Sequence, residues 1–180
     1  MVGIRKRLLL LLVFLPVWAS HAVAEGESAN ESALLKAAYI YNFAKFTRWE
    51  QMPEEDVLHL CVLGRDSLSD PLQHLAGKWV GERHISVNML SHLHDAECHI
   101  IYFSASQQAH YRSQLQGLAG QPLLTISELS GFAVDGGMIE LFEEQGRIRF
   151  RVNLEAVEAG GLTLSSRMLN LAEIVGGEAR

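Results

Sequence analysis

The run CHIIYFSA, from Cys98 to Ala105, constrains the fold more than any other segment because it is almost uniformly apolar. Such a run suits a strand buried on both faces, as in a parallel sheet covered by helices on two sides. Similar short strands are expected over 57–63 in VLHLCVLG, over 84–90 in HISVNML and in PLLTIS, residues 122–127. The central prediction is therefore a sheet of short, buried strands.

Helical segments separate these strands in the sequence. SDPLQHLAG predicts a short helix that begins at Ser69 or Asp70 and ends at Gly77. Ser106 is expected to cap a second helix from about 107 to 118. Strands that alternate with helices imply right-handed crossovers and a parallel sheet.

The two ends of the chain add different elements. A helix is expected from about Glu31 to Arg48, and GGMIELFEEQGRIRFRVN predicts a β-hairpin with Gly146 in its turn. A short helix over 154–159 and a final helix over 165–175 complete the chain. The predicted fold class is a single-domain α/β protein with a mostly parallel sheet flanked by helices, a C-terminal β-hairpin and a final helix.

The N-terminus has the layout of a secretory signal. Arg5, Lys6 and Arg7 precede an apolar run that is too short for a transmembrane span of about 20 residues, and small residues follow it. We expect cleavage after Ala24 and location in the periplasm, with an uncleaved membrane anchor as the alternative. The expected organisation is a signal peptide over 1–24, a loose segment over 25–31, one domain over 32–175 and a tail over 176–180.

Charge narrows the classes of partner. The chain has 15 basic and 21 acidic residues, and loss of the three basic residues of the signal leaves 12 basic ones, a net charge of about −9. Nucleic acids and anionic lipids are bound by clusters of Lys and Arg. The composition therefore argues against both as partners.

The two cysteines, Cys61 and Cys98, are expected to form a disulfide because their number is even and the chain is expected to be exported. Two buried free thiols are the alternative.

No motif for catalysis or cofactor binding can be written through this sequence. The glycines are isolated, so neither GxGxxG nor GxxxxGK[ST] occurs, and no G-x-S-x-G element is present. SHLHDAECH, residues 91–99, is rich in zinc-type ligands, but loop histidines beside a bridged cysteine explain it more simply than a metal site. We expect no enzymatic activity, no cofactor and no metal, and keep a metal-dependent enzyme as one alternative.

The carboxyl ends of the predicted strands offer the best position for a small ligand. Open parallel α/β sheets bind ligands beyond these ends, where the winding reverses. The candidate ligand-binding residues there are Arg65, Asp66, Ser104 and Ser106. The alternative is that these side chains act only as helix caps.

The N-terminal helix carries two apolar stripes when its residues are placed 100° apart. Ala33, Ala37 and Ala44 form a narrow stripe suited to close packing on a sheet. The opposite side is aromatic, and the candidate partner-binding residues on it are Tyr39, Phe43, Phe46 and Trp49. The alternative is that this aromatic stripe belongs to the core of the same chain.

These segments together resemble a known family. AAYIYNFAKFTRWE, LHLCVLG, CHIIYFSAS and GFAVDGGMIELFEEQGRIRFRVNLEAVEAGGLTLSSRMLNLAEIV occur in the order and spacing of the YfiR family, also described as DUF4154, over about 32–175. The resemblance implies a periplasmic α/β protein, commonly dimeric, without enzymatic activity. Cys61 and Cys98 match the bridge between the first and third strands of members that carry disulfides. The second pair of those members is missing, and Ala133 and Glu140 stand near its expected position.

The resemblance also implies a function. Its best understood members repress an inner-membrane diguanylate cyclase by binding the cyclase's periplasmic domain, which restrains cyclic di-GMP and biofilm formation. We expect this function and a homodimer here. A periplasmic small-ligand sensor for another signalling partner is the alternative, with the ligand unidentified.

Overall fold

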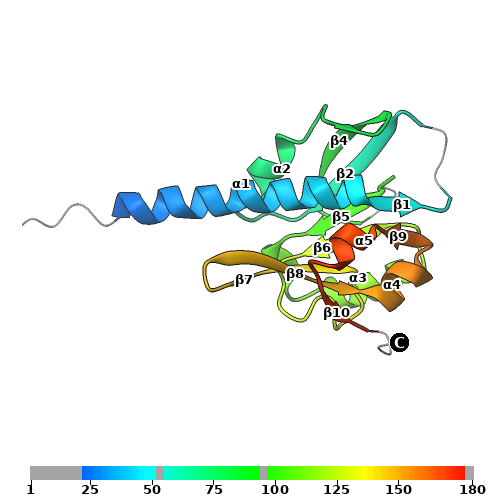
Figure 1. Ribbon diagram of the computed structural model, residues 1–180. Helices are drawn as coiled ribbons and strands as arrows, with labels where there is room; N and C mark the ends of the chain where they lie inside the picture. Colours follow the sequence, from blue (N-terminus) through cyan, green and yellow to red (C-terminus); the bar gives the residue numbers. More distant parts are fainter. Residues whose placement is uncertain (1–21, 52–54, 94–96, 177–180) are drawn as a thin grey trace, which may run out of the picture.

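The structure is a computed structural model that describes residues 22–51, 55–93 and 97–176, with side chains described from residue 28 onward. Its main element is an eight-stranded sheet with strand order β10-β8-β7-β6-β5-β2-β4-β3 (Figure 1). The strands of this sheet are β2 (Val57–Leu63), β3 (Trp79–Val80), β4 (Arg83–Leu90), β5 (Ile100–Phe103), β6 (Leu124–Ser127), β7 (Ile139–Glu144), β8 (Arg147–Asn153) and β10 (Glu173–Val175). Two further strands, β1 (Thr47–Trp49) and β9 (Leu162–Leu164), pair with each other antiparallel. The helices are α1 (Ala22–Phe46), α2 (Ser69–Gln73), α3 (Tyr111–Leu118), α4 (Leu154–Ala159) and α5 (Ser166–Leu169), with a 3-10 turn η1 (Ala105–Gln107).

The centre of the sheet is parallel. β4, β2, β5, β6 and β7 are neighbours in this order, and each adjacent pair runs in the same direction. β2 precedes β4 and β5 in the chain yet lies between them, so the winding of the sheet reverses between β2 and β5. β7 and β8 form an antiparallel hairpin, and β10 extends the sheet parallel to β8. The predicted fold class is confirmed.

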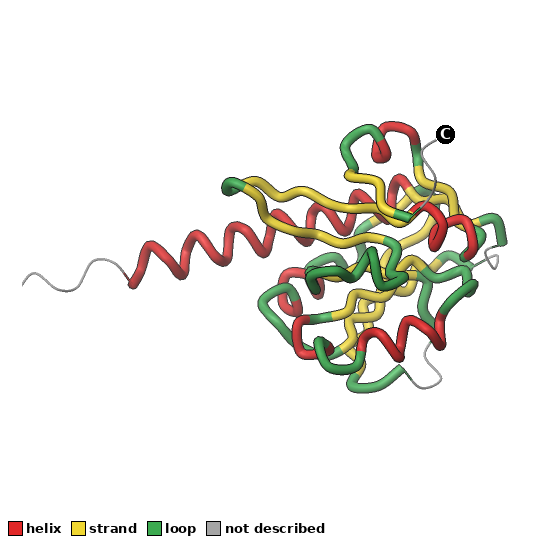
Figure 2. The backbone as a smooth tube through the Cα atoms, turned by 90° about the horizontal axis from the view of Figure 1, so that it is seen from below, coloured by secondary structure: helices red, strands yellow, loops and turns green. Residues whose placement is uncertain are grey.

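Both faces of the sheet are covered, as CHIIYFSA predicted. Ile100 and Tyr102 belong to the apolar cluster that includes α1, whereas Ile101 and Phe103 belong to the cluster that includes α3. Figure 2 shows α1 as a long helix that runs beside the strands and extends beyond them. Alternate residues of β5 therefore face two different cores, and all four are buried.

The hairpin turn is formed as predicted. Gln145 and Gly146 connect β7 to β8, and both have positive φ, 52° and 71°. Two central residues with positive φ define the turn whose twist matches two antiparallel strands. The short helix over 154–159 is also confirmed, with the Asn153 side chain accepting a hydrogen bond from the Ala156 amide.

Two expectations about helix limits are wrong. Helix α1 begins at Ala22, so residues 25–31, expected to be loose, are helical. Ser106 lies inside η1 and makes no cap, because its hydroxyl already accepts a hydrogen bond from the Arg65 amide. Residues 1–21 of the predicted signal peptide over 1–24 lie outside the described residues.

The final helix is present as α5, but its predicted extent over 165–175 is wrong. Ser165 caps α5, but this helix ends at Leu169 and the chain continues into β10. The edge of β8 presents unpaired backbone groups, and pairing with β10 satisfies them. The β-branched pair Ile174 and Val175 suits a strand, so tertiary pairing prevails over the helical pattern.

Candidate functional site

The predicted disulfide is present. Cys61 on β2 is joined to Cys98, which precedes β5, with a Cα–Cα distance of 5.8 Å. Cys61 is fully buried in the cluster that includes α3. The bond ties two neighbouring parallel strands on that face, and it excludes both the free-thiol alternative and the use of Cys98 as a metal ligand.

Two histidines lie close to this disulfide. The rings of His59 and His99 stack with centroids 5.5 Å apart, and the His59 amide donates a hydrogen bond of 3.0 Å to His99 Nδ1. Burial, followed by the nearby His59, lowers the pKa of His99 below its usual value. In the described residues no three His, Cys, Asp or Glu side chains lie together as a metal site, and His94 and Asp95 of the histidine-rich segment are outside those residues.

The structure brings most of the predicted ligand-binding residues together where the winding reverses. The Asp66 carboxylate accepts hydrogen bonds from the Tyr102 hydroxyl and the Ala105 amide, both at 2.8 Å. The hydroxyls of Ser104 and Ser106 are 2.8 Å apart. Arg65 takes part through its backbone amide, which donates to Ser106 at 3.1 Å.

This strand-end cluster is closely packed. A Cβ atom added to Gly64 would lie only 2.2 Å from the Ser106 hydroxyl and 2.4 Å from the Ser104 hydroxyl. The Asp66 and Ser106 oxygens therefore serve local hydrogen bonds at the junction of β2 and β5. These contacts favour the structural role of the cluster over the ligand-binding one.

Tyr102 connects the strand-end cluster to α1. Its hydroxyl also lies 3.4 Å from the Glu128 carboxylate, and Glu128 pairs with Lys36 of α1. Burial raises the pKa of Tyr102, and Asp66 and Glu128 raise it further. The sequence reasoning missed Tyr102 and Lys36, because only the folded chain places an α1 lysine beside the end of β6.

The alanine stripe of α1 packs on the sheet as predicted, but the aromatic stripe is divided. Phe43 is buried against Phe150 of β8, with ring centroids 4.9 Å apart, so it presents no surface to a partner. Tyr39 is half-buried, and its ring lies 6.3 Å from that of Phe150. The expectation that Phe43 contacts a partner is therefore corrected, because β8 already covers this ring.

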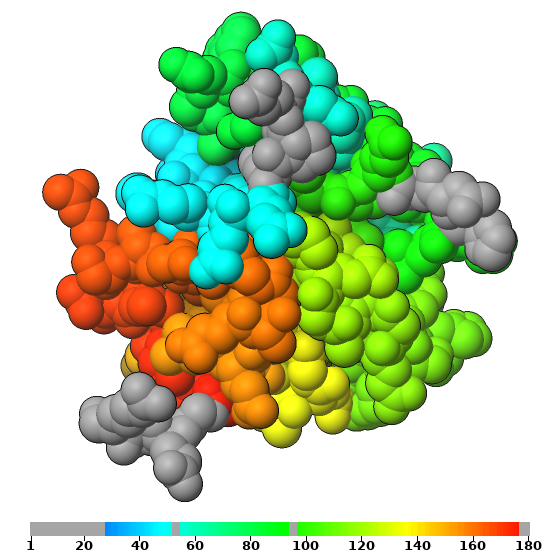
Figure 3. All heavy atoms as spheres, turned by 90° about the vertical axis from the view of Figure 1, so that its right-hand side faces the viewer, coloured from blue at the N-terminus to red at the C-terminus, as the bar shows by residue number. Residues whose placement is uncertain are grey.

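The end of α1 keeps exposed aromatic surface. Phe46, the last residue of α1, is 37% exposed, and Trp49 of β1 is half-buried. Figure 3 shows this end of the molecule, where the segment following α1 lies against the segment that contains β9. The backbone of Phe46 is fixed there by a hydrogen bond from the Ser165 amide to its carbonyl oxygen, at 2.9 Å.

The first turns of α1 extend beyond the tip of the β7–β8 hairpin, and the following part of the helix runs beside it (Figures 1 and 2). A groove of about 470 Å³ lies between them, which we call the α1–hairpin groove. Its α1 side contains Glu31, Leu35 and Tyr39, and its hairpin side contains Arg147 and Ile148. Leu35 is 51% exposed, so the groove offers apolar surface between charged groups.

The positions near the missing second cysteine pair are linked without a disulfide. The buried carboxylate of Glu140 accepts hydrogen bonds from the Ala133 amide at 3.1 Å and from Arg151 Nη1 at 2.9 Å. Arg151 also contacts Glu173 at 3.1 Å and lies 3.9 Å from the centroid of the Phe142 ring. The Glu140 carboxylate therefore links the 133 segment to the hairpin through the Ala133 amide, and its ion pair with Arg151 joins β7 to β8.

The fold and the exposed surfaces together define the class of this protein. It is a single-domain α/β protein with a disulfide-tied parallel sheet and a long helix whose exposed side chains are free to meet another molecule. Residues 33–173 match the family model described as DUF4154, YfiR/HmsC-like, and the chain belongs to that family. Membership supports, in general terms, a periplasmic regulator of cyclic di-GMP signalling that interacts with a partner of that pathway. Among the described helices, none has the length and apolar character needed to cross a membrane.

Proposed function

We propose that this protein is a periplasmic repressor that binds the periplasmic domain of a membrane-bound diguanylate cyclase and thereby restrains cyclic di-GMP and biofilm formation. The observation that carries the proposal is the exposed aromatic end of α1 on a chain of this family. Phe46 is exposed although its neighbour Phe43 is buried. Exposed aromatic side chains on a fixed backbone are typical anchors of protein interfaces. We assign Phe46 and the half-buried Trp49 to the contact with the cyclase.

Repression requires that the protein bind the inactive arrangement of the cyclase more tightly than the active one. A regulator shifts such an equilibrium only by its difference in affinity for the two states. Each tenfold preference for the inactive state contributes about 1.4 kcal/mol to the shift. The chain itself then needs no catalytic residue.

We also infer a homodimer formed through the α1–hairpin groove. Glu31 and Arg147 flank the apolar centre of the groove, which contains Leu35 and Ile148. A surface that carries both charges around an apolar centre can meet a two-fold related copy of itself, since each carboxylate then faces a guanidinium. The substitution Leu35→Glu is expected to convert the dimer to a monomer in light scattering, and a wild-type protein that is already monomeric would refute the interface.

A deletion strain tests the repressor proposal. Loss of the protein is expected to raise cyclic di-GMP, and expression of wild-type protein is expected to restore the low level. Phe46→Glu should fail to restore it, whereas Leu171→Glu, the same change at a 74% exposed apolar residue that belongs to neither α1 nor β1, should succeed. Unchanged cyclic di-GMP in the deletion strain would exclude the cyclase as partner, and full restoration by Phe46→Glu would exclude this surface.

A further inference from the structure

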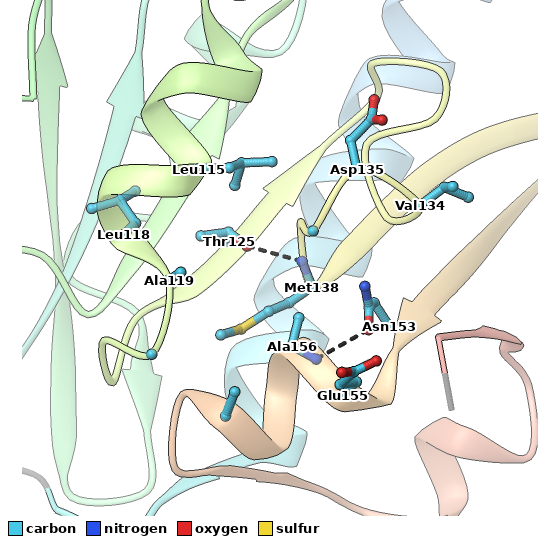
Figure 4. Close-up of a pocket in the computed structure, with 13 residues that line it drawn as sticks. Leu115, Leu118, Ala119, Thr125, Val134, Asp135, Met138, Asn153, Glu155 and Ala156 are labelled. Carbon is cyan, nitrogen blue, oxygen red and sulfur yellow. Dashed lines mark hydrogen bonds between the residues drawn. The ribbon is translucent and has the colours of Figure 1, made fainter. Parts of the chain in front are cut away.

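A cavity of about 440 Å³ lies apart from both surfaces assigned above (Figure 4). It is enclosed by α3, the loop that follows α3, β6, the 134–138 segment and α4. Cavities that hold small ligands in proteins have volumes of about 300 to 1,000 Å³. This one lies within that range.

Apolar and polar groups share the wall of the cavity in equal measure. Leu115 and Leu118 of α3 line one side, and Met138 and Ala156 line the other. Val134 also lines the cavity and is 71% exposed, so part of the apolar lining is in contact with water. An apolar ligand body would cover these side chains, and the gain in free energy follows the apolar area removed from water.

The charge of the lining has one sign. Asp135 and Glu155 line the cavity, and among the residues that the structure describes no Lys, Arg or His does. Asp135 is compensated from outside, because its carboxylate accepts hydrogen bonds from Tyr111 at 2.6 Å and Arg112 at 2.9 Å. Glu155 has no ion pair in the described part of the chain. Its carboxylate is therefore the unbalanced charge at the mouth of the cavity.

Two buried polar side chains hold the shape of the cavity. Thr125 accepts a hydrogen bond from the Met138 amide at 2.9 Å, and Asn153 donates to the Ala133 carbonyl at 2.8 Å. Asn153 also caps α4 by accepting from the Ala156 amide. These bonds fix the segment 133–138 and α4 relative to β6, so the cavity is formed without a ligand.

We propose that this cavity binds a small organic cation, an amine with an apolar body, whose ammonium group pairs with Glu155 while its body contacts Leu118, Val134 and Met138. The site is distinct from the strand-end cluster, where hydrogen bonds within the chain already use the polar groups. It is also independent of the repressor proposal, since none of its lining residues belongs to the exposed end of α1 or to the α1–hairpin groove.

Three probes with the same apolar body and different charge test the site: 2-phenylethylamine, 2-phenylethanol and phenylacetate. Binding to the full periplasmic chain is measured by calorimetry and by amide chemical shifts. The amine is expected to bind at least tenfold more tightly than the other two and to shift the amides of Leu118, Val134 and Ala156. Glu155→Gln should weaken binding of the amine by at least fivefold. Glu158→Gln changes an exposed residue of the same helix outside the lining and should leave binding of the amine unchanged.

A variant that fills the cavity supplies a second test. Ala156→Phe places a ring in the cavity and should abolish binding of the amine, with the far-ultraviolet circular dichroism of the wild type retained. Equal binding of phenylacetate and the amine, or binding that survives both Glu155→Gln and Ala156→Phe, would overturn the proposal. Absence of binding by all three probes at 10 mM would overturn it as well.

Discussion

Glu140 offers the sharpest test of how the hairpin is held to the rest of the sheet. Its side chain is buried, with 1% of the residue exposed, and it satisfies the buried Ala133 amide as well as Arg151. Glu140→Ala leaves the amide unpaired, at a cost of about 1 to 3 kcal/mol. Loss of the charged hydrogen bond to Arg151 adds about 1 kcal/mol, a reduced value because Arg151 is partly exposed and keeps Glu173.

The expected loss of unfolding free energy for Glu140→Ala is therefore about 3 kcal/mol, or about 6 to 12 °C in Tm for a domain of this size. Urea unfolding followed by circular dichroism measures it. Glu140→Gln keeps an oxygen for the Ala133 amide and should lose only about 1 kcal/mol. The control Glu144→Ala removes an exposed pair with Arg149 and should lose less than about 0.5 kcal/mol. A loss below about 1 kcal/mol for Glu140→Ala, or equal losses for the Ala and Gln variants, would refute this reasoning.

Three further predictions concern the disulfide, the core residue Phe43 and the titration of His99. The double variant Cys61→Ala/Cys98→Ala should lose about 4 kcal/mol in guanidinium unfolding, because the bridge spans 37 residues and restricts the unfolded chain. Phe43→Ala should lose about 3 to 5 kcal/mol, because it empties the space between α1 and β8. Acid should destabilise the protein through His99: its pKa is lowered in the folded state by burial and by His59, so the unfolded chain binds the proton more readily. Stability is then complete above about pH 6.5, the ordinary pKa of histidine, and falls as the pH drops below it.

Control variants distinguish the titration of His99 from that of other groups. His99→Asn keeps a hydrogen-bond acceptor for the His59 amide but cannot titrate, so its Tm should fall less steeply with acid than that of the wild type. His74→Asn changes an exposed histidine and should keep the wild-type slope. An unchanged slope in His99→Asn would assign the acid sensitivity to other groups. A Phe43→Ala variant as stable as the wild type would contradict the buried position of this ring.

The elements that the sequence predicted well are those with strong local signals. CHIIYFSA is apolar at every strand position, and the structure buries all four residues of β5. The turn at Gln145 and Gly146 has local turn chemistry, and the hairpin forms there. The Cys61–Cys98 pairing followed from an even cysteine count in a chain that is expected to be exported.

The predictions were wrong where contacts with distant parts of the chain determine the secondary structure or the burial of a residue. β10 forms because β8 offers it an edge, which the local pattern of 165–175 does not reveal. Phe43 and Phe46 are three residues apart on one helix, yet only Phe43 meets Phe150. A wheel gives the direction of a side chain but not the position of the strand that covers it.

The same limit applies to the candidate sites. The residues Asp66, Ser104 and Ser106 were found because strand ends are recognisable in the sequence, but their mutual hydrogen bonds were not. The cavity beside Glu155 combines α3, the 134–138 segment and α4, which have no common motif. Such a site can be found only once the fold has placed these segments together.

Reconstituted cyclase activity tests the central claim most directly. A diguanylate cyclase with its periplasmic domain is placed in proteoliposomes, and synthesis of cyclic di-GMP is measured while this protein is added on the periplasmic side. Synthesis is expected to fall to a low plateau with wild-type protein and with Leu171→Glu, and to stay high with Phe46→Glu. Unchanged synthesis at saturating wild-type protein, with each candidate cyclase of the same cell, would contradict repression by direct binding.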